Sequence, residues 1–305
     1  MRILISGGAG FIASHIQDAY LELGHEVAIV DDLSSGEKGN LHPKSHFYLC
    51  NITDPKLEDI FKEFKPDVIS HHAAQISVRE SIRKPQFDCQ INGIGTLNIL
   101  EQAIKFSVKK IIFSSSGGAI YGEQQSFPAN ENHPLEPLSP YGITKLLGEK
   151  YLQFYQNTYG LETVALRYSN VYGPRQNPHG EAGVVAIFIQ KMLSGEVPCI
   201  NGDGLQTRDY IYVADVVKAN ILALKAGTQG VFNIATGQET NVLEIYGALQ
   251  KILNFSPSPK HGEAKPGEQR RSALSFEKIH QMHHWSPETT FPQGLQNTVK
   301  YFQSK

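Results

Sequence analysis

Residues 2–13 read Arg2-Ile3-Leu4-Ile5-Ser6-Gly7-Gly8-Ala9-Gly10-Phe11-Ile12-Ala13. The first five residues predict a short buried strand, and the glycines that follow predict a tight turn. A helix is expected over residues 14–24, where a glycine ends it, and a second strand over residues 26–30. A strand, a glycine-rich turn, a helix and a strand in this order predict the first part of a dinucleotide-binding unit. The alternative is a glycine-rich turn in some other α/β protein.

The turn and the acidic end of the second strand predict the cofactor contacts. Glycines let the backbone approach a pyrophosphate, which rests on the N-terminus of the following helix. Asp31 and Asp32 stand about 20 positions after the turn, where an acidic residue accepts hydrogen bonds from the adenosine ribose. The Asp31 carboxylate would repel the 2′-phosphate of NADP, so NAD is the expected cofactor. The candidate contacts are Gly7, Gly10, Phe11, Ile12, Asp31 and Asp32.

A second motif is the pair Tyr141 and Lys145, in the run Ser139-Pro140-Tyr141-Gly142-Ile143-Thr144-Lys145. Residues four apart project from one face of a helix, so both side chains reach the same space. A phenol ordinarily has a pKa of about 10, and a nearby ammonium favours the phenolate. Tyr141 would then move protons near neutral pH. The pair alone equally fits a solvated helix face, but together with a dinucleotide site it indicates redox catalysis.

Strand-like runs alternate with helical stretches through the first half of the chain. The expected strands cover residues 3–6, 26–30, 46–50, 67–70, 110–114 and 163–168. This alternation predicts an α/β fold with a doubly wound parallel sheet. The alternation fades after Asn170. Residues 1–170 are therefore expected to form a Rossmann domain that binds NAD, and residues 171–305 a smaller, mixed α/β lobe that binds the substrate.

On these motifs the chain is similar to extended short-chain dehydrogenases/reductases, and among them to the UDP-glucose 4-epimerase group of nucleotide-sugar epimerases. The glycine spacing is GxxG, with Ala13 where that family has a third glycine that packs the helix on the sheet. One added methyl group is expected to be tolerated there. The resemblance covers nearly the whole chain. It implies that residues 209–237 return to the first lobe, with a helix over 213–225 and a strand over 231–234.

The resemblance places further residues around NAD. Residues 31–36 resemble the loop at the adenosine ribose, and residues 50–54 the segment that holds the adenine, with Asn51 where an aspartate is usual. Residues 72–75 and 92–96 resemble stretches that flank the nicotinamide half, and Lys145 is expected to hydrogen-bond the nicotinamide ribose. The contacts that this resemblance adds are Ser34, Ser35, Gly36, Asn51, Ile52, His72, Ala73, Ala74, Gln75, Asn92 and Tyr168.

The family implies 4-epimerisation of a UDP-hexose by transient oxidation, because no neighbouring carbonyl would stabilise a carbanion at C4. Tyr141 takes the proton of the 4-hydroxyl while hydride leaves C4 for the nicotinamide. The 4-ketose then turns over, hydride returns to its other face, and NAD stays bound. Ser116 is the expected hydroxyl that positions the sugar oxygen. Ser115 is the alternative, because Gly117-Gly118 leaves the register open.

The segment after these serines bears on the type of reaction. Related dehydratases and decarboxylases carry acidic residues just after the catalytic serine or threonine. Here the residues between Ser116 and Tyr121 are Gly117-Gly118-Ala119-Ile120, and the nearest acid is Glu123. The segment therefore favours simple oxidation and re-reduction.

For the substrate diphosphate the sequence offers Arg208 with Asn170 beside it, since a planar guanidinium matches phosphate oxygens. Arg271 and Glu268 are weaker candidates, and a plain surface charge is the alternative for each. Ser272 stands where the epimerase group associates a bulky tyrosine with UDP-glucose and UDP-galactose only. The small Ser272 implies room for a 2-acetamido group, and thus for UDP-N-acetylglucosamine and UDP-N-acetylgalactosamine.

Composition narrows the partners and the compartment. The 305 residues carry a formal net charge of −2, which gives no electrostatic case for nucleic acid or an anionic membrane. A cytoplasmic protein is predicted for three reasons. The three cysteines are scattered, the first strand leaves no room for a signal peptide before it, and no apolar run approaches the length of about 20 residues that a membrane helix needs. The twelve histidines lack ligand spacing, so no metal is expected.

Other functions and an assembly remain open at this point. A UDP-uronic acid 4-epimerase or a 4-keto sugar reductase is an alternative within the family, and a reductase should release its cofactor. A non-catalytic nucleotide-sensing protein is a further alternative, against which the retained Tyr141 and Lys145 speak. The family also implies a homodimer that pairs helices over residues 92–107 and 141–159. Its seam would comprise Leu147, Tyr151, Phe154 and Tyr155, although the same stripe could pack on its own sheet.

Overall fold

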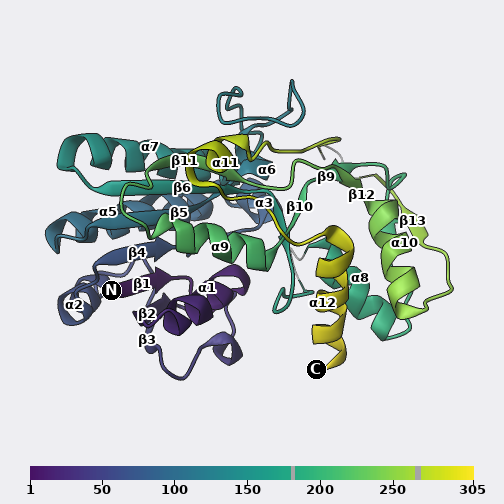
Figure 1. The fold of residues 1–305 in the computed structure, drawn as a ribbon, viewed down its shortest axis with the longest axis horizontal. Helices are drawn as coiled ribbons and strands as arrows, with labels where there is room; N and C mark the ends of the chain where they lie inside the picture. Colours follow the sequence, from purple (N-terminus) through teal and green to yellow (C-terminus); the bar gives the residue numbers. More distant parts are fainter. Residues whose placement is uncertain (180–182, 265–268) are drawn as a thin grey trace. The chain divides into compact units, whose positions relative to one another are not determined.

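The computed structural model describes residues 1–179, 183–264 and 269–305 and divides the chain into two compact units (Figure 1). The first unit comprises Met1–Tyr121, Leu135–Tyr168 and Val217–Phe232. The second comprises Gly122–Pro134, Ser169–Val216 and Asn233–Lys305. Each unit is therefore built from three separate stretches of the chain.

A seven-stranded sheet forms the centre of the first unit, in the order β11-β6-β5-β4-β1-β2-β3. Neighbouring strands from β3 to β6 run parallel, so the connections between them cross over through helices. All six strands predicted for the first half are present, and the doubly wound parallel sheet is confirmed. The strands are β1 (Arg2–Ser6), β2 (Glu26–Asp31), β3 (His46–Leu49), β4 (Val68–His71), β5 (Lys110–Ser116), β6 (Glu162–Tyr168) and β11 (Gly230–Ile234).

Helices cover both faces of this sheet (Figure 1). They are α1 (Phe11–Glu22), η1 (Lys38–Asn40), α2 (Leu57–Phe64), α3 (Val78–Arg83), α4 (Pro85–Asp88), η2 (Cys89–Ile94), α5 (Gly95–Lys105), α6 (Gly117–Ile120), α7 (Pro140–Tyr159) and α9 (Val213–Ala223). Leu4 and Phe113 pack with α2, α5 and α7 in one apolar core, whereas Ile3 and Ile5 alternate to the opposite face. On that face the Tyr20 hydroxyl of α1 donates to the Asn220 carbonyl of α9 at 3.3 Å.

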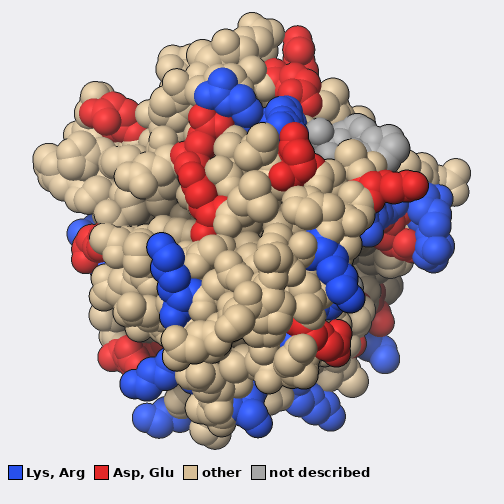
Figure 2. Space-filling model, turned by 90° about the vertical axis from the view of Figure 1, so that its right-hand side faces the viewer, with Lys and Arg blue, Asp and Glu red and all other residues tan. Residues whose placement is uncertain are grey.

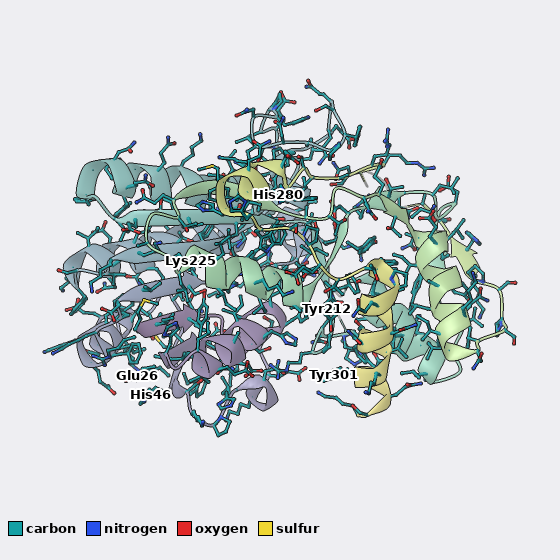
Figure 3. All side chains as sticks on the ribbon, in the orientation of Figure 1. Glu26, His46, Tyr212, Lys225, His280 and Tyr301 are labelled. Atoms are coloured by element: carbon teal, nitrogen blue, oxygen red, sulfur yellow. The ribbon has the colours of Figure 1, made fainter. Side chains whose placement is uncertain are left out.

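A buried lysine ties the returning segment to the sheet. Lys110, at the start of β5, donates its ammonium to the carbonyls of Ala223 and Lys225 at 3.1 and 2.5 Å. The same ammonium lies 3.1 Å from a carboxylate oxygen of Glu162. Figure 3 labels Lys225 just beyond α9. These contacts explain why Val217–Phe232 belongs to the first unit.

Two helices differ from the expected boundaries. The first helix begins at Phe11, inside the glycine-rich motif and three residues before the predicted start, because Gly10 is its cap residue. The helix expected over 92–107 is divided, with a π-helical turn at Cys89–Ile94 followed by α5 at Gly95–Lys105. Such turns are frequent at functional sites.

The second unit has its own apolar core, formed mainly by α8, α10 and α12. Residues 122–134 were expected in the first lobe, but they belong to this second unit. The Ala129 amide donates to the Ala273 carbonyl at 2.9 Å, and the Ala129 carbonyl accepts the Ser275 amide at 2.8 Å. Its elements are β7 (Asn170–Tyr172), α8 (Val184–Leu193), β8 (Cys199–Asn201), β9 (Thr207–Arg208), β10 (Tyr210–Tyr212), β12 (Thr240–Asn241), α10 (Val242–Leu253), β13 (Lys260–Gly262), α11 (Glu277–His283) and α12 (Phe291–Gln303).

Charged side chains are mixed by sign on the face that Figure 2 shows. Among the described residues no helix is long and apolar enough to cross a membrane. No group of three or more histidine, cysteine, aspartate or glutamate side chains in the described ranges could hold a metal ion. Cys50, Cys89 and Cys199 are free thiols.

Candidate active site

The glycine turn between β1 and α1 is the first element of the candidate NAD site. Gly7 has a φ of +71°, and a Cβ added to it would lie 2.6 Å from the Ala73 nitrogen, so a side chain would collide there. Gly10 caps α1 with no side-chain hydrogen bond. The first-turn amides, which include those of Phe11 and Ile12, therefore keep their capacity to bind an anion. This cradle fits the pyrophosphate of NAD.

Asp31 ends β2 and braces the glycine turn. Its carboxylate oxygens accept the N–H groups of Ala9 at 3.0 Å and Leu33 at 2.8 Å. Burial raises the pKa of Asp31, and the two backbone hydrogen bonds act in the opposite direction. Each oxygen keeps acceptor capacity for a ribose hydroxyl.

Asp32, which follows Asp31 in the chain, forms a polar cluster with Ser34 and Asn51. Asp32 accepts the Ser34 hydroxyl and amide at 2.6 and 2.9 Å and the Asn51 side-chain amide at 2.6 Å. Burial opposes ionisation of Asp32, but these hydrogen bonds outweigh it and lower its pKa. The Asn51 oxygen accepts from the amide and hydroxyl of Thr53 at 2.9 and 2.7 Å. The Asn51 side chain thus already holds protein partners at both ends.

The other residues expected at the adenosine differ in exposure. Ser35 is exposed and Gly36 is half-buried against Ala9. The Ile52 side chain is buried in the core, and its carbonyl accepts the Asn98 amide at 2.6 Å. Ile52 can therefore meet a ligand only through its backbone.

A hydrogen-bond chain defines the tautomer of His71 at the end of β4. The Thr96 hydroxyl donates to the Asn92 carbonyl at 2.6 Å, so it accepts from Nε2 of His71 at 3.0 Å. The Nδ1 atom of His71 then accepts the Ser6 hydroxyl at 2.6 Å. Burial lowers the pKa of His71 and of the adjacent His72 to about 3, so both rings are neutral.

The predicted nicotinamide-side residues lie in the same unit. Ala73 and Ala74 are half-buried in the segment that follows His72. The Gln75 amide donates to the Asn92 side-chain oxygen at 2.8 Å, and the Asn92 side-chain amide donates to the Gln75 carbonyl at 3.0 Å. The Tyr168 ring stacks on His72 with centroids 6.4 Å apart.

Tyr141 and Lys145 lie one turn apart on α7. The Lys145 ammonium lies 5.8 Å from the centre of the Tyr141 ring and donates to the Ser114 carbonyl at 2.9 Å. Burial lowers the pKa of Lys145 to about 8. Burial also raises the pKa of Tyr141 to about 12, although the Ser116 hydrogen bond lowers it. The sequence predicts that Lys145 lowers the pKa of the Tyr141 phenol. This prediction is wrong for the protein alone, because burial raises that pKa and the Lys145 ammonium bonds the Ser114 carbonyl and not the phenol.

A close helix contact seats Tyr141. Ser139 caps α7 by accepting the Gly142 amide at 3.1 Å. A Cβ at Gly142 would lie 2.4 Å from the Ala119 carbonyl oxygen, so only glycine lets the first turn of α7 approach α6 this closely. Because α6 directly follows Ser116, this contact brings the Ser116 hydroxyl to Tyr141.

The two candidate serines have different partners. Ser116 lies close enough to Tyr141 for its side chain to lower the pKa of the phenol. Ser115 points to the opposite face of β5 and donates to the buried Glu149 carboxylate at 2.5 Å. The structure does not bring Ser115 to Tyr141.

Glu149 in turn belongs to a buried ion pair. Its two oxygens accept Nε and Nη2 of Arg167 at 2.9 and 2.7 Å, and Nη1 of Arg167 donates to the Tyr121 hydroxyl at 2.8 Å. The side chains of Glu149 and Arg167 are each only 4% exposed. Burial disfavours the charged guanidinium, but the hydrogen bond and charge of Glu149 outweigh it and raise the pKa of Arg167.

The residues expected at the diphosphate lie in the second unit. Asn170 is exposed on β7. It pairs with Tyr210 of β10, which stands two residues after Arg208 in the chain. Arg208 is half-buried and donates to the Thr207 carbonyl at 2.7 Å. Arg271 forms a two-bond ion pair with Glu239 at 3.0 and 2.6 Å. Glu268 lies outside the described residues.

The position expected to set substrate size is covered. Ser272 is 2% exposed and accepts the Gln124 side-chain amide at 3.3 Å. The Gln124 side-chain oxygen accepts the Ala273 amide at 3.0 Å. A buried amide side chain, hydrogen-bonded at both ends, thus lies against the small residue in the second unit.

Sequence reasoning missed several buried polar residues that organise the two units. They are Asp88, Gln124, Glu149, Arg167 and Asp209. Asp209 accepts the Thr236 hydroxyl and the Gly237 amide at 2.7 and 2.8 Å, next in the chain to Arg208. Arg167 had a visible signal, since a charge inside the apolar run of a parallel strand requires a buried partner. The partners themselves depend on packing.

Comparison with known proteins places the chain in a family of enzymes. The sequence profile of the NAD dependent epimerase/dehydratase family matches residues 3–235. The chain is similar to the crystal structure of a UDP-glucose 4-epimerase with UDP-glucose from Thermotoga maritima. The TM-score is 0.98 and the identity 47%, over 100% of this chain and 99% of that one.

Two further solved structures are similar over almost their whole length. A UDP-glucose 4-epimerase in complex with NAD from Thermus thermophilus has a TM-score of 0.94 and 41% identity, over 99% of both chains. A UDP-N-acetylglucosamine 4-epimerase in complex with UDP-N-acetylmuramic acid from Methanobrevibacter ruminantium has a TM-score of 0.94. It is 36% identical over 99% of this chain and 98% of that chain.

Proposed function

We propose that this chain, which belongs to the NAD dependent epimerase/dehydratase family, catalyses NAD-dependent 4-epimerisation of a UDP-hexose, with UDP-glucose and UDP-galactose as substrates. The observation that carries the proposal is the placement of Tyr141 and Lys145 one turn apart on α7, where the Lys145 ammonium lies 5.8 Å from the centre of the Tyr141 ring and binds the Ser114 carbonyl near the end of β5. The same unit holds the glycine turn and Asp31. A site of this kind can move a proton at a hydroxyl while NAD is held beside it.

Each residue has a proposed role. The glycine turn, the α1 N-terminus and Asp31 hold NAD, which when bound supplies a hydride acceptor and donor for C4 of the sugar. Tyr141 takes the proton of the 4-hydroxyl, and Ser116 hydrogen-bonds the same oxygen. Burial raises the pKa of Tyr141, and the Lys145 ammonium, 5.8 Å from the centre of its ring, is proposed to favour the phenolate once substrate and NAD are bound.

The segment after Ser116 favours epimerisation over elimination. Residues 117–120 form α6 and contain no acidic side chain. Elimination of water needs a positioned acid or base besides Tyr141. We therefore place the chain with the epimerases of its family.

Substrate binding is proposed to involve the second unit. Arg208 and Asn170 supply the donors for the diphosphate, and Arg271 supplies a further guanidinium. Ser272 is proposed to leave room for a 2-acetamido group once the Gln124 side chain turns aside. UDP-N-acetylglucosamine and UDP-N-acetylgalactosamine are thus proposed as additional substrates.

Turnover without added NAD tests the function. The purified protein should interconvert UDP-glucose and UDP-galactose, because an epimerase regenerates and retains its cofactor. UDP-N-acetylglucosamine should be converted in a parallel assay that resolves the C4 epimers. No conversion of any of these substrates, even with NAD supplied, would redirect the assignment to uronic acids or to a reductase.

Ser272→Tyr tests the proposed size selection. The bulky ring should lower kcat/KM for UDP-N-acetylglucosamine by about tenfold or more relative to that for UDP-glucose, because one mismatched group in a pocket typically costs that much. The matched control is Ser275→Tyr, which changes a nearby serine to the same residue. An unchanged ratio of the two substrates in Ser272→Tyr would remove the size argument.

A homodimer is proposed from an exposed apolar stripe. Ile143 and Phe154 lie three turns apart on one face of α7 and are 54% and 50% exposed. Leu147 lies between them, against η2 at Gly93. Tyr155, expected in this seam, instead packs in the core of its own unit.

Phe154→Glu should convert the dimer to a monomer in sedimentation velocity at micromolar concentration, because it places a charge in an apolar interface. Leu23→Glu is the matched control, since Leu23 is similarly exposed but lies after α1. A monomeric parent protein would contradict the proposal directly.

The free thiols additionally support a proposed cytoplasmic location.

A further inference from the structure

Asp88 is a buried carboxylate that the proposed chemistry does not yet use. It ends α4, where the π-helical turn η2 begins, and it is 0% exposed. One oxygen accepts the side-chain amides of Gln75 at 2.8 Å and Asn92 at 3.1 Å. The other accepts the Thr144 hydroxyl at 2.7 Å. All three of these donors are neutral, so the charge has no cation among its hydrogen-bond partners.

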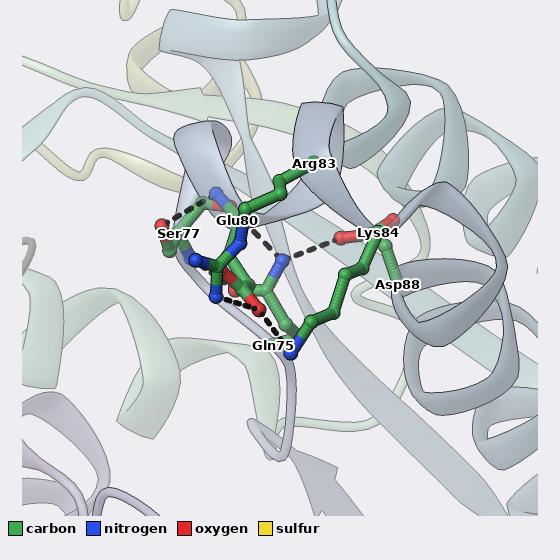
Figure 4. Close-up of polar contacts among 6 residues, drawn as sticks. All are labelled: Gln75, Ser77, Glu80, Arg83, Lys84 and Asp88. Atoms are coloured by element: carbon green, nitrogen blue, oxygen red, sulfur yellow. Dashed lines mark hydrogen bonds and ion pairs between the residues drawn. The ribbon is translucent and has the colours of Figure 1, made fainter.

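A neighbouring carboxylate shows the contrast. Glu80 on α3 lies 2.7 Å from the Arg83 guanidinium and 2.9 Å from the Lys84 ammonium, so its charge is balanced where it stands (Figure 4). Figure 4 also shows the Gln75 amide reaching the Asp88 carboxylate from the segment that precedes α3. Asp88 must therefore find its countercharge at longer range.

The three donors belong to segments that build the site. Thr144 lies on α7 between Tyr141 and Lys145, and its hydroxyl also lies 3.1 Å from the Tyr141 carbonyl. Gln75 and Asn92 bind each other and flank the proposed nicotinamide half. A single carboxylate thus links α7, η2 and the chain after β4.

On α7, Lys145 directly follows Thr144, whose hydroxyl donates to Asp88 at 2.7 Å, so Asp88 lies beside the turn of α7 that carries this cation. The Lys145 ammonium bonds the neutral Ser114 carbonyl and lies 5.1 Å from the centre of the Phe113 ring. Four titratable groups from the elements packed around the Lys145 ammonium face it: Tyr141, His71, His72 and Asp88. Both histidine rings are neutral. Burial lowers the pKa of Lys145 and the Asp88 charge raises it, and the same charge also raises the pKa of Tyr141.

We propose that Asp88 is a positioning residue that fixes Thr144, and with it the turn of α7 that carries Tyr141 and Lys145, and that its buried charge acts on the Lys145 ammonium. The inference rests on the proposed epimerase function for its kinetic consequence. Its electrostatic part concerns Lys145 alone and can be measured without turnover. Removing the Asp88 charge should therefore lower the pKa of Lys145. Removing the hydrogen bond from Thr144 to Asp88 should displace the first turns of α7 without changing that charge.

The decisive experiment compares Asp88→Asn with Glu80→Gln in the full chain. Lysine is labelled with ¹³C at Cε, the Lys145 resonance is assigned by its loss in Lys145→Met, and its titration midpoint is followed by NMR. Asp88→Asn should lower the midpoint by about one pH unit, as loss of a nearby opposite charge does. The alkaline limb of the kcat profile should move in the same direction, because activity is lost as pH rises through the pKa of Lys145. Glu80→Gln should move neither.

Three further variants complete the test. Thr144→Val should lower kcat at every pH while leaving the Lys145 midpoint in place, and Thr144→Ser, which keeps the hydroxyl, should restore kcat. Asp88→Ser is smaller and still accepts a hydrogen bond, so it repeats the measurement if Asp88→Asn does not fold.

The outcomes separate the two proposals. A folded Asp88 variant with an unchanged Lys145 midpoint and an unchanged alkaline limb overturns the role of Asp88. A parent protein that converts no UDP-hexose overturns the proposed function. In that case a lowered Lys145 midpoint in Asp88→Asn still supports the electrostatic link.

Discussion

Tyr141→Phe is expected to lower kcat for UDP-hexose epimerisation by about 10²- to 10⁴-fold, the range typical of losing a general acid–base group. The substitution removes only the phenol hydroxyl, so the ring keeps its place in the first turn of α7. Bound NAD and the unfolding midpoint should stay close to those of the parent protein. Initial rates with UDP-glucose, NAD content and thermal unfolding measure the three quantities.

Tyr159→Phe is the matched control for this experiment. Tyr159 is the last residue of the same helix and is 53% exposed, so the change removes a phenol hydroxyl from α7 far from Ser116. It should leave kcat unchanged. Tyr141→Phe with the full kcat of the parent protein would exclude Tyr141 as the base, whatever else the family resemblance implies.

Arg167→Met is expected to reduce the free energy of unfolding by about 3–5 kcal/mol, the cost of removing one partner of a buried ion pair. Glu149 would lose both guanidinium hydrogen bonds while still accepting the Ser115 hydroxyl, and the Tyr121 hydroxyl would lose the hydrogen bond that Arg167 donates. A carboxylate that is 4% exposed cannot regain water without local opening. Equilibrium unfolding in urea, followed by fluorescence and circular dichroism, measures the change.

Two controls identify the buried charge as the cause. Arg167→Met combined with Glu149→Leu should recover much of the lost stability, because both charges are then absent. Arg270→Met breaks an equally bidentate pair with Asp203 at 2.9 and 2.8 Å, but that pair lies in solvent and its loss should have little effect. Equal destabilisation by Arg167→Met and Arg270→Met would contradict the argument.

The sheet was predictable because its signals are local. Continuous apolar runs such as Ile3-Leu4-Ile5 are buried on both faces, and this pattern identifies strands of a parallel sheet before any tertiary contact is known. The spacing of Tyr141 and Lys145 likewise predicts a shared helix face. The predicted helix boundaries were less accurate, because α1 begins inside the glycine motif and η2 interrupts the helix expected over residues 92–107.

The electrostatics of the site were not predictable from spacing. The sequence places Lys145 one turn from Tyr141, but it does not reveal that the ammonium turns to the Ser114 carbonyl or that burial governs both pKa values. The choice between Ser115 and Ser116 depended on the register of β5. Asp88 gave no signal at all, because only Asn92 among its three partners is near it in the chain, whereas Gln75 and Thr144 lie 13 and 56 positions away.

The double use of Asp31 has a consequence for redesign of cofactor preference. A common strategy to admit a phosphorylated ribose is to replace the acid at the end of the second strand. Here that acid also holds the Ala9 amide, so its loss would loosen the loop that must cradle the pyrophosphate. Changes at Asp32 and Ser34, which bond each other away from the glycines, would alter the ribose environment and leave the loop braced.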